Sequence, residues 1–301
     1  MIFLKPMTVT TVKLNSSIPE PDVAQGEVVW SAGTYNLGQR VIKTSNHSVY
    51  EVVADPSTTD EPEVGAAKKP ATWVRVGATN RYKMFDVTNN TSSTGEDIVI
   101  EFTPIELVNS VACFNVLCSS ATVKAFNGAG AEIYNKEIEL KTRPLVNGWF
   151  NYYYSGFSII DKFVLIDLPP ITDGKIQITF TGGASVGTCV FGEQVAIGDA
   201  QWGTGAEQLN FRPVNEDQFG NLSYGSGFKA KLVNYDIMVD TPLLDSAYSS
   251  ISSLGDYPTV FIGNPSLIGD VTLAYGFVRD LNVTYTTPIK SNISLTVRGV
   301  I

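Results

Sequence analysis

The sequence is poor in charged residues, and this shortage removes one class of partner. Charged residues make up 17% of the 301 residues, and the net charge is −9. A protein that binds nucleic acid gains much of its affinity by neutralising phosphates with basic side chains. The negative balance therefore argues against a nucleic-acid partner. Low charge suits β-sheets whose outer faces carry hydroxyl and amide groups.

Cysteine and histidine are also scarce. The three cysteines, Cys113, Cys118 and Cys189, form no Cys-x-x-Cys pair, and an odd number gives no disulfide framework. Two of them lie in the apolar run "VACFNVLCSS", which predicts buried thiols that pack as small hydrophobic side chains. Zinc sites need clusters of histidine and cysteine, so we expect no metal and no cofactor. The single histidine, His47, is predicted to be a solvated residue of a hairpin turn.

Recognisable catalytic motifs are missing as well. The sequence has no Gly-x-Ser-x-Gly motif, no phosphate-binding loop and no dinucleotide-binding glycine pattern. A Ser-His-Asp triad would have to run through His47. Acids such as Asp173, Glu216 and Asp217 lie in turn sequences, where solvation or turn hydrogen bonding is the ordinary role. We therefore expect no enzymatic activity.

Long apolar runs are absent too. No stretch of about 18 apolar residues occurs, and the N-terminus lacks the apolar region and cleavage site of a signal peptide. We expect no membrane insertion, and we expect the chain to fold in a reducing cytosol.

What the sequence does contain is strand signals. Hydrophobic residues make up 44% of the chain, and they recur in short β-branched or aromatic runs separated by turn residues. In "KIQITF", Ile176, Ile178 and Phe180 are predicted to share one face of a strand. This pattern predicts an all-β protein with sandwiches or barrels. One short helix is predicted within 240–255, with Asp240 as its cap and apolar Leu243, Leu244, Ala247 and Ile251.

Shifts in composition divide the chain into four parts. We predict an N-terminal strand or arm over 1–25, a small aromatic-rich module over 26–78, a β-sandwich over 79–198, and a C-terminal β-rich domain with the short helix over 199–301. Residues 55–72 are polar and rich in proline, and they are predicted to form a long loop inside the small module.

The small module has a recognisable aromatic pattern: Trp30, Tyr35, Gly38, Val41, Tyr50, and a closing Pro70-x-x-Trp73. This order resembles the small carbohydrate-binding modules of chitinases and cellulases. The resemblance implies that Trp30, Tyr35, Tyr50 and Trp73 stack on sugar rings. The alternative is that all four are core or inter-domain packing. Acids of the 55–72 loop (Asp55, Asp60, Glu61 and Glu63) are expected to cover the face that a sugar would use.

The segment after this module carries a second resemblance. Residues 79–86, "TNRYKMFD", are similar to a junction in tailed-bacteriophage virion proteins, where a small module leads into a β-sandwich. Later segments follow in the same order: "VAIGDAQWGTG" (195–205), "NEDQFGNLSY" (215–224), "YPTVFIGNPS" (257–266) and the C-terminal strands from 272 onward. The resemblance implies a tail or baseplate component of a phage particle.

The densest aromatic cluster is "NGWFNYYYSGF" at 147–157. Consecutive aromatics on a strand point to both faces, so one face is predicted to meet solvent or a partner. Trp149, Phe150, Tyr152, Tyr153 and Tyr154 are the candidate interface residues. They are predicted either to contact another subunit or ligand, or to pack between two domains of the same chain.

Two functions from different classes remain. The first is a structural virion protein of the tail or baseplate, assembled in the host cytoplasm, whose partners are other tail subunits and further copies in a symmetric homo-oligomer. The second is a glycan-binding adhesin that recognises a cell-surface polysaccharide of the host.

Overall fold

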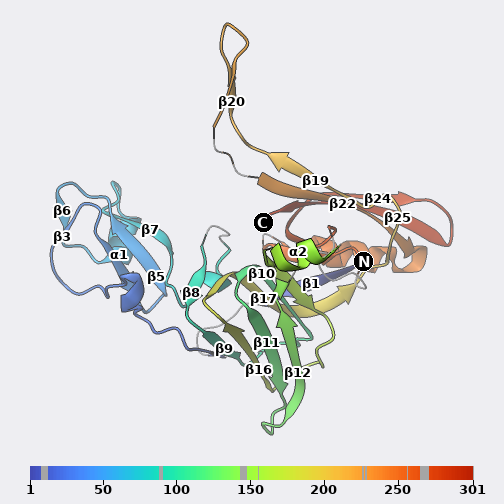
Figure 1. Ribbon diagram of the computed structural model, residues 1–301, viewed down its shortest axis with the longest axis horizontal. Coiled ribbons are helices and arrows are strands. Elements are labelled where there is room, and N and C mark those ends of the chain that lie inside the picture. Colours follow the sequence, from blue (N-terminus) through green and yellow to red (C-terminus); the bar gives the residue numbers. More distant parts are fainter. Residues whose placement is uncertain are drawn as a thin grey trace.

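Most of the regular structure of the protein consists of antiparallel strands, which confirms the all-β class (Figure 1). The computed structural model describes residues 1–7, 13–87, 91–142, 148–154, 156–225, 227, 229–255, 257–264 and 271–300. Most of its strands belong to a larger and a smaller sheet.

The larger sheet has the strand order β15 (Lys162–Leu165), β10 (Ser110–Leu117), β17 (Ala184–Ala196), β1 (Ile2–Pro6), β23 (Thr259–Ile262), β24 (Ala274–Tyr285), β25 (Lys290–Gly299), β22 (Lys229–Asp240) and β18 (Asp199–Ala200); β8 (Ser93–Gly95) pairs with β17, and β19 (Gly205–Asn210) pairs with β22. The smaller sheet has the order β12 (Glu132–Glu139), β11 (Ser120–Phe126), β16 (Lys175–Thr181), β9 (Ile98–Phe102) and β2 (Leu14–Ser16).

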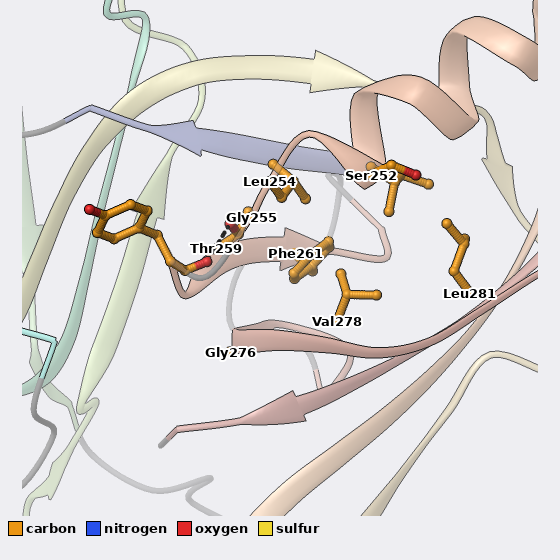
Figure 2. Close-up of a pocket in the computed structure, with 10 residues that line it drawn as sticks. Ser252, Leu254, Gly255, Thr259, Phe261, Gly276, Val278 and Leu281 are labelled. Atoms are coloured by element: carbon orange, nitrogen blue, oxygen red, sulfur yellow. Dashed lines mark hydrogen bonds between the residues drawn. The ribbon is translucent and has the colours of Figure 1, made fainter.

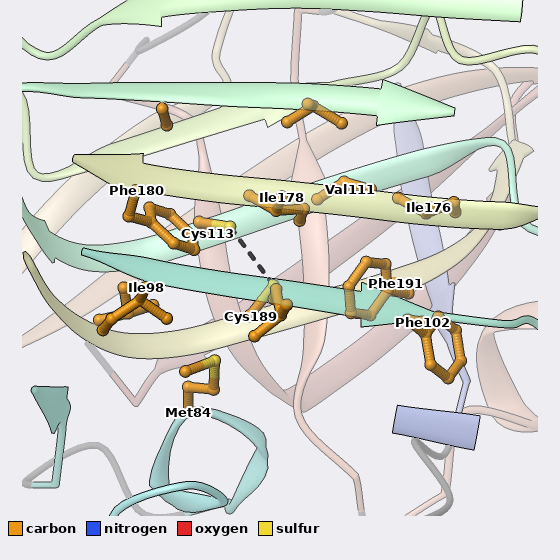
Figure 3. Close-up of a cluster of buried hydrophobic side chains, with 14 of the residues drawn as sticks. Met84, Ile98, Phe102, Val111, Cys113, Ile176, Ile178, Phe180, Cys189 and Phe191 are labelled. Atoms are coloured by element: carbon orange, nitrogen blue, oxygen red, sulfur yellow. Dashed lines mark hydrogen bonds between the residues drawn. The ribbon is translucent and has the colours of Figure 1, made fainter. Parts of the chain in front are cut away.

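A β-sandwich forms where the smaller sheet packs on β10 and β17 of the larger one. Its core contains Ile176, Ile178 and Phe180, all 0% exposed, so the alternation predicted for β16 is confirmed. Phe102 and Phe191 stack across the two sheets with ring centroids 4.8 Å apart (Figure 3). The cysteines are buried and free, as predicted. In Figure 3 the Cys113 thiol meets the Cys189 sulfur at 3.5 Å.

The first strand of the chain joins the sandwich to the C-terminal half. β1 pairs with β17 on one side and with β23 on the other, both antiparallel. Phe3 enters the C-terminal core, while Leu4 enters an apolar cluster on the opposite face of the sheet. One sheet therefore crosses from the sandwich into the C-terminal half, passing through a strand from the N-terminus.

The C-terminal half contains the predicted helix. α3 (Leu244–Ser252) follows a short 3-10 turn, η4 (Thr241–Leu243), and buries Leu244, Ala247 and Ile251. Leu243, however, is exposed. The Asp240 side chain does not cap the helix but forms an ion pair with Lys290 at 2.8 Å, because the chain leaves β22 beside β25.

The small module stands apart from the two sheets (Figure 1). It contains a sheet of β4 (Arg40–Lys43), β5 (Ser48–Val52) and β7 (Trp73–Ala78), and a pair formed by β3 (Tyr35–Asn36) and β6 (Ser57–Thr58). The 55–72 segment was predicted to be a long loop, but it contains β6 and the helix α1 (Pro62–Ala67). Pro62 occupies the first turn of α1, where a missing N–H costs nothing.

Further short elements complete the chain. They are η2 (Val23–Gln25) and η3 (Lys83–Phe85), the pair β13 (Lys141–Thr142) and β14 (Ser158–Ile159), the helix α2 (Trp149–Tyr154), and the pair β20 (Val214–Glu216) and β21 (Leu222–Tyr224).

Candidate functional site

Two of the four predicted sugar-stacking residues lie in the core of the small module. Trp73 is 0% exposed and Tyr50 is 5% exposed. The indole N–H of Trp73 donates to the backbone oxygen of Asp60 at 3.0 Å. The prediction that Trp73 and Tyr50 stack on a sugar is therefore wrong. A module of this size has few aliphatic side chains, so its aromatic rings must form its core.

The other two candidates, Trp30 and Tyr35, are half-buried at the rim of that core. The Tyr35 ring meets Trp73 edge-on with centroids 5.5 Å apart, and its hydroxyl donates to the Ser31 carbonyl at 2.9 Å. The Lys43 ammonium lies 4.6 Å from the centroid of the Trp30 ring. One ring face of Trp30 is therefore occupied by a cation.

Acids of the 55–72 segment tie that segment to the module. Glu61 forms the ion pair with Lys43, the same cation that covers Trp30. Asp60 accepts hydrogen bonds from Lys68 at 2.7 Å and from the Thr72 hydroxyl at 2.9 Å. Glu61 therefore acts on Trp30 indirectly, because its carboxylate pairs with the lysine that lies over the tryptophan ring.

The "TNRYKMFD" segment forms the joint between the module, the N-terminal segment and the sandwich. Asn80 is 0% exposed. Its amide donates to Asp22 at 2.7 Å and to the Thr94 carbonyl at 2.9 Å, and its side-chain oxygen accepts from the Thr94 N–H at 3.0 Å. Its backbone N–H donates to Glu27 at 2.6 Å. An asparagine side chain both donates and accepts hydrogen bonds. Together with its backbone N–H, Asn80 therefore links its own segment to the segment of Asp22 and Glu27 and to Thr94.

His47 belongs to this joint rather than to solvent. It lies in the β4–β5 turn as predicted, with a positive φ of 53°. Its Nδ1 is 2.7 Å from a carboxylate oxygen of Glu20, and its ring packs on Tyr82 with centroids 3.9 Å apart. The expectation of a solvated residue is wrong because the N-terminal segment returns to this turn.

The same cluster does not have the order of a catalytic triad. The Thr79 hydroxyl donates to Glu20 at 2.8 Å, so it points to the carboxylate and not to the imidazole of His47. A nucleophile activated by histidine needs the opposite arrangement. These contacts therefore serve to hold the module in place.

The predicted interface residues at 149–154 form a helix, not a strand. Aromatic side chains three and four positions apart meet on a helix surface, and Trp149 accordingly stacks on Tyr153 with centroids 6.4 Å apart. The predicted alternation of faces is therefore wrong. The exposed fractions are 79% for Trp149, 74% for Phe150, 46% for Tyr152, 70% for Tyr153 and 76% for Tyr154. This exposure contradicts the alternative of packing between two domains of the same chain.

A second group of outward-facing apolar residues lies on an element that was not predicted from the sequence. Residues 211–225, called the arm from here on, contain β20 and β21 and extend the β19–β22 ribbon away from the body (Figure 1). Every residue of the arm is exposed. Its large apolar side chains are Phe211, Val214, Phe219, Leu222 and Tyr224.

Shifted pKa values are scattered over different elements. Burial raises the pKa of the Cys118 thiol to about 11, and burial also raises the pKa of the Tyr275 hydroxyl. Hydrogen bonds from Lys68 and then Thr72 lower the pKa of Asp60, and hydrogen bonds from Asn221 lower that of Asp217. Each shift has a cause in packing or in a turn.

Two cavities lie at the edges of α3. One of about 210 Å³ lies between α3 and the strands β23 and β24, and its walls include the apolar side chains of Leu254, Phe261 and Val278 (Figure 2). The other, of about 490 Å³, is bordered by Lys5 and Asp86 among others. Over the described ranges, no group of three or more His, Cys, Asp or Glu side chains is placed to hold a metal. In the same ranges, no helix combines the length and apolar character that crossing a membrane requires.

The chain matches no family model and no curated protein. Among solved structures, it is similar to a mutant of chitosan-binding module 1 from a chitosanase/glucanase of Paenibacillus sp. IK-5, with a TM-score of 0.25 and 14% sequence identity. The match covers 37% of this chain and 83% of that chain.

Proposed function

We propose that this protein is a structural subunit of a tailed-bacteriophage virion, in the tail or baseplate, and that it acts through protein–protein contacts in a symmetric homo-oligomer. The observation that carries the proposal is the outward placement of aromatic side chains on α2 and on the arm. Soluble monomers rarely expose large contiguous apolar patches, and such patches mark interaction sites. Tyrosine, tryptophan and phenylalanine are also enriched in protein interfaces.

The virion role in particular is supported by the motif order along the sequence. The "TNRYKMFD" junction resembles phage virion proteins, and in this chain its residues Thr79, Asn80 and Met84 are buried in the joint. A joint of this kind holds a small module at a fixed place on a larger body. Free thiols and the all-β architecture are compatible with folding in a reducing host cytosol before release in a particle.

Sedimentation of particles tests this role. Particles from a lysate of the producing cells are purified on a density gradient and probed with antiserum against the chain. We expect the chain to co-sediment with intact tailed particles, and gold-labelled antibody to mark the tail or baseplate in electron micrographs. A chain found only in the soluble fraction as a monodisperse monomer would overturn the proposal.

Glycan binding by the small module is the second candidate, because Trp30 and Tyr35 keep part of their rings at the surface. A glycan array compares the wild-type chain with Trp30→Ala, and with Val74→Ala as a control at an exposed position of the same module. Binding that Trp30→Ala removes and Val74→Ala keeps would establish the lectin role. No binding by the folded wild-type chain would remove it.

A further inference from the structure

The tip of the arm is held in one shape by its own hydrogen bonds. The Asp217 carboxylate accepts from the backbone N–H groups of Phe219 at 2.8 Å and of Asn221 at 2.9 Å, and from the Asn221 amide at 2.9 Å. Gly220 completes the turn with a φ of 81°, which glycine adopts without strain. The turn is formed by Asp217, Phe219, Gly220 and Asn221 within the segment "NEDQFGNLSY" (215–224). It presents Phe219, 80% exposed, at the end of a rigid turn.

Every residue of the arm is exposed in the described chain, and at its base the Arg298 guanidinium lies 5.4 Å from the ring centroid of Phe211. β20 and β21 pair only with each other in the described part of the chain, and an isolated two-stranded hairpin is marginally stable in water. Its apolar side chains, Phe219, Leu222 and Tyr224 among them, gain nothing from pointing into solvent. Such an element needs an apolar surface that the described part of its own subunit does not supply.

The chain carries a surface of that kind on α2. Trp149, Phe150, Tyr153 and Tyr154, called the platform from here on, are between 70% and 79% exposed. Their rings pack on one another in two pairs, Trp149 with Tyr153 and Phe150 with Tyr154. The platform is therefore a preformed aromatic surface, not a set of independent side chains.

We propose that the arm of one copy of this chain packs on the platform of the next copy. The inference rests on the proposed function, because it names the partner and the contact that would build the homo-oligomer. An arm and a platform are different surfaces, so each copy offers one of each. Contacts of this kind run head to tail and generate a ring when the rotation between copies closes.

The charges of the two surfaces agree with this pairing. Both charged residues at the arm tip, Glu216 and Asp217, are acidic and exposed. Residues 148–160 contain no charged residue, and the exposed Lys141 has its ammonium 4.7 Å from the ring centroid of Phe157, three positions after the last platform residue. A docked arm would bring its two carboxylates toward this lysine. Two acidic arm tips would repel each other, which disfavours an arm-to-arm contact.

The exposed areas are also of the right size. A buried aromatic side chain contributes about 150–250 Å², so the four platform rings offer on the order of 500 Å². The five apolar side chains of the arm offer a similar area. A stable protein interface buries about 800 Å² on each partner. The two surfaces therefore supply most of one such interface.

A mixing experiment tests the contact. The arm variant carries Phe219→Ser, Leu222→Ser and Tyr224→Ser, and the platform variant carries Trp149→Ser and Tyr153→Ser. All these side chains are exposed, so both variants are expected to fold. In sedimentation velocity we expect a multimer for the wild-type chain and a monomer for each variant alone. An equal mixture should form dimers and nothing larger, because only one intact arm meets one intact platform.

Other results in the same experiment overturn the proposal. An arm variant that assembles like the wild type would show that the arm makes no contact between copies. A mixture that stays monomeric, or a wild-type chain that is monomeric at every accessible concentration, would exclude the head-to-tail pairing. Dimers of the arm variant alone would indicate a platform-to-platform contact instead.

Cross-linking gives the contact directly. The three native cysteines are buried, so a bismaleimide reagent is expected to react at introduced surface thiols. A mixture of Phe219→Cys and Tyr153→Cys chains should give a cross-linked heterodimer. The control mixture of Phe219→Cys with Val74→Cys, an exposed position on the small module, should give at least tenfold less.

The virion role and this contact can fail separately. A chain that co-sediments with particles while its arm and platform variants assemble like the wild type keeps the proposed function and loses the contact. A chain that follows the mixing pattern but is absent from particles keeps the contact and loses the virion role.

Discussion

The small module, on one hand, and α2 with the arm, on the other, are both rich in aromatic residues and place them in opposite environments. Trp73 is fully buried, whereas Trp149 is 79% exposed. In the module the rings replace a missing aliphatic core. On α2 and the arm, no layer of the described chain covers them. Aromatic residues therefore form a core where other elements of the chain pack over them, and they form an exposed surface where no such element does.

The largest expected effect separates the two tryptophans. Trp73→Ala removes the centre of the module core and should lower the free energy of unfolding of the module by about 3–5 kcal/mol. Trp149→Ala should change stability by no more than about 0.5 kcal/mol, because it removes an exposed side chain. Denaturant unfolding at a protein concentration low enough to keep the wild-type and variant chains monomeric, followed by circular dichroism, measures both. Equal losses for the two variants would refute the contrast.

The next effect concerns the joint. Asn80→Ala removes the hydrogen bonds of the Asn80 amide to Asp22 Oδ2 and to the Thr94 backbone in a buried place and should cost roughly 2–4 kcal/mol, since each unsatisfied group costs about 1–3 kcal/mol. Limited proteolysis should then cut near 79–86 and release the module. Asn215→Ala, an exposed asparagine of the arm, is the matched control and should leave the cutting pattern unchanged.

A smaller effect concerns two lysines that lie over aromatic rings. Lys43→Ala removes the cation over Trp30 together with its ion pair to Glu61, and it should destabilise the module by about 1 kcal/mol. Lys141→Ala removes the more exposed contact with Phe157 and should cost less than about 0.5 kcal/mol. Thermal unfolding of the two variants checks the order. A larger shift for Lys141→Ala would contradict it.

The smallest expected effect is a dependence on acid. The pKa of Asp60 is lowered in the folded module, chiefly by the Lys68 hydrogen bond and then by Thr72. The contribution of Asp60 to the free energy of unfolding is therefore fully present above the ordinary aspartate pKa of 3.8, and it is lost as the pH falls through the lower pKa of the folded state. Unfolding measured from pH 5 to pH 2 should show stability falling in this window. Asp60→Asn should flatten that slope, and an unchanged slope would show that Asp60 contributes nothing.

The sequence predicted the parts of the fold that depend on local pattern. Alternation in β16 placed Ile176, Ile178 and Phe180 in the core, and helical spacing located α3 within 240–255. It failed where distant segments meet. Nothing local shows that β1 enters the larger sheet between β17 and β23, or that Glu20 reaches His47.

The site was harder to predict than the fold for the same reason. Trp73 and Trp30 belong to one aromatic pattern, and only the packing separates the buried ring from the half-exposed one. Five of the six residues at 149–154 are aromatic, so the run lacks the spacing of apolar and polar residues that would distinguish a helix from a strand. The arm had a usable signal: the Asp217–Asn221 turn lies between two short runs of strand-forming residues. The sequence could not show that no other element of the described chain covers the apolar side chains of these runs.

The proposed assembly buries the outward aromatic side chains of α2 and the arm between copies of the chain in a particle. Electron microscopy of the native assembly, at a resolution that traces side chains, tests it most directly. The account predicts a symmetric ring in which Phe219 of each copy lies against Trp149 and Tyr153 of the next. A map in which the arm and α2 remain solvent-exposed on every copy would contradict it.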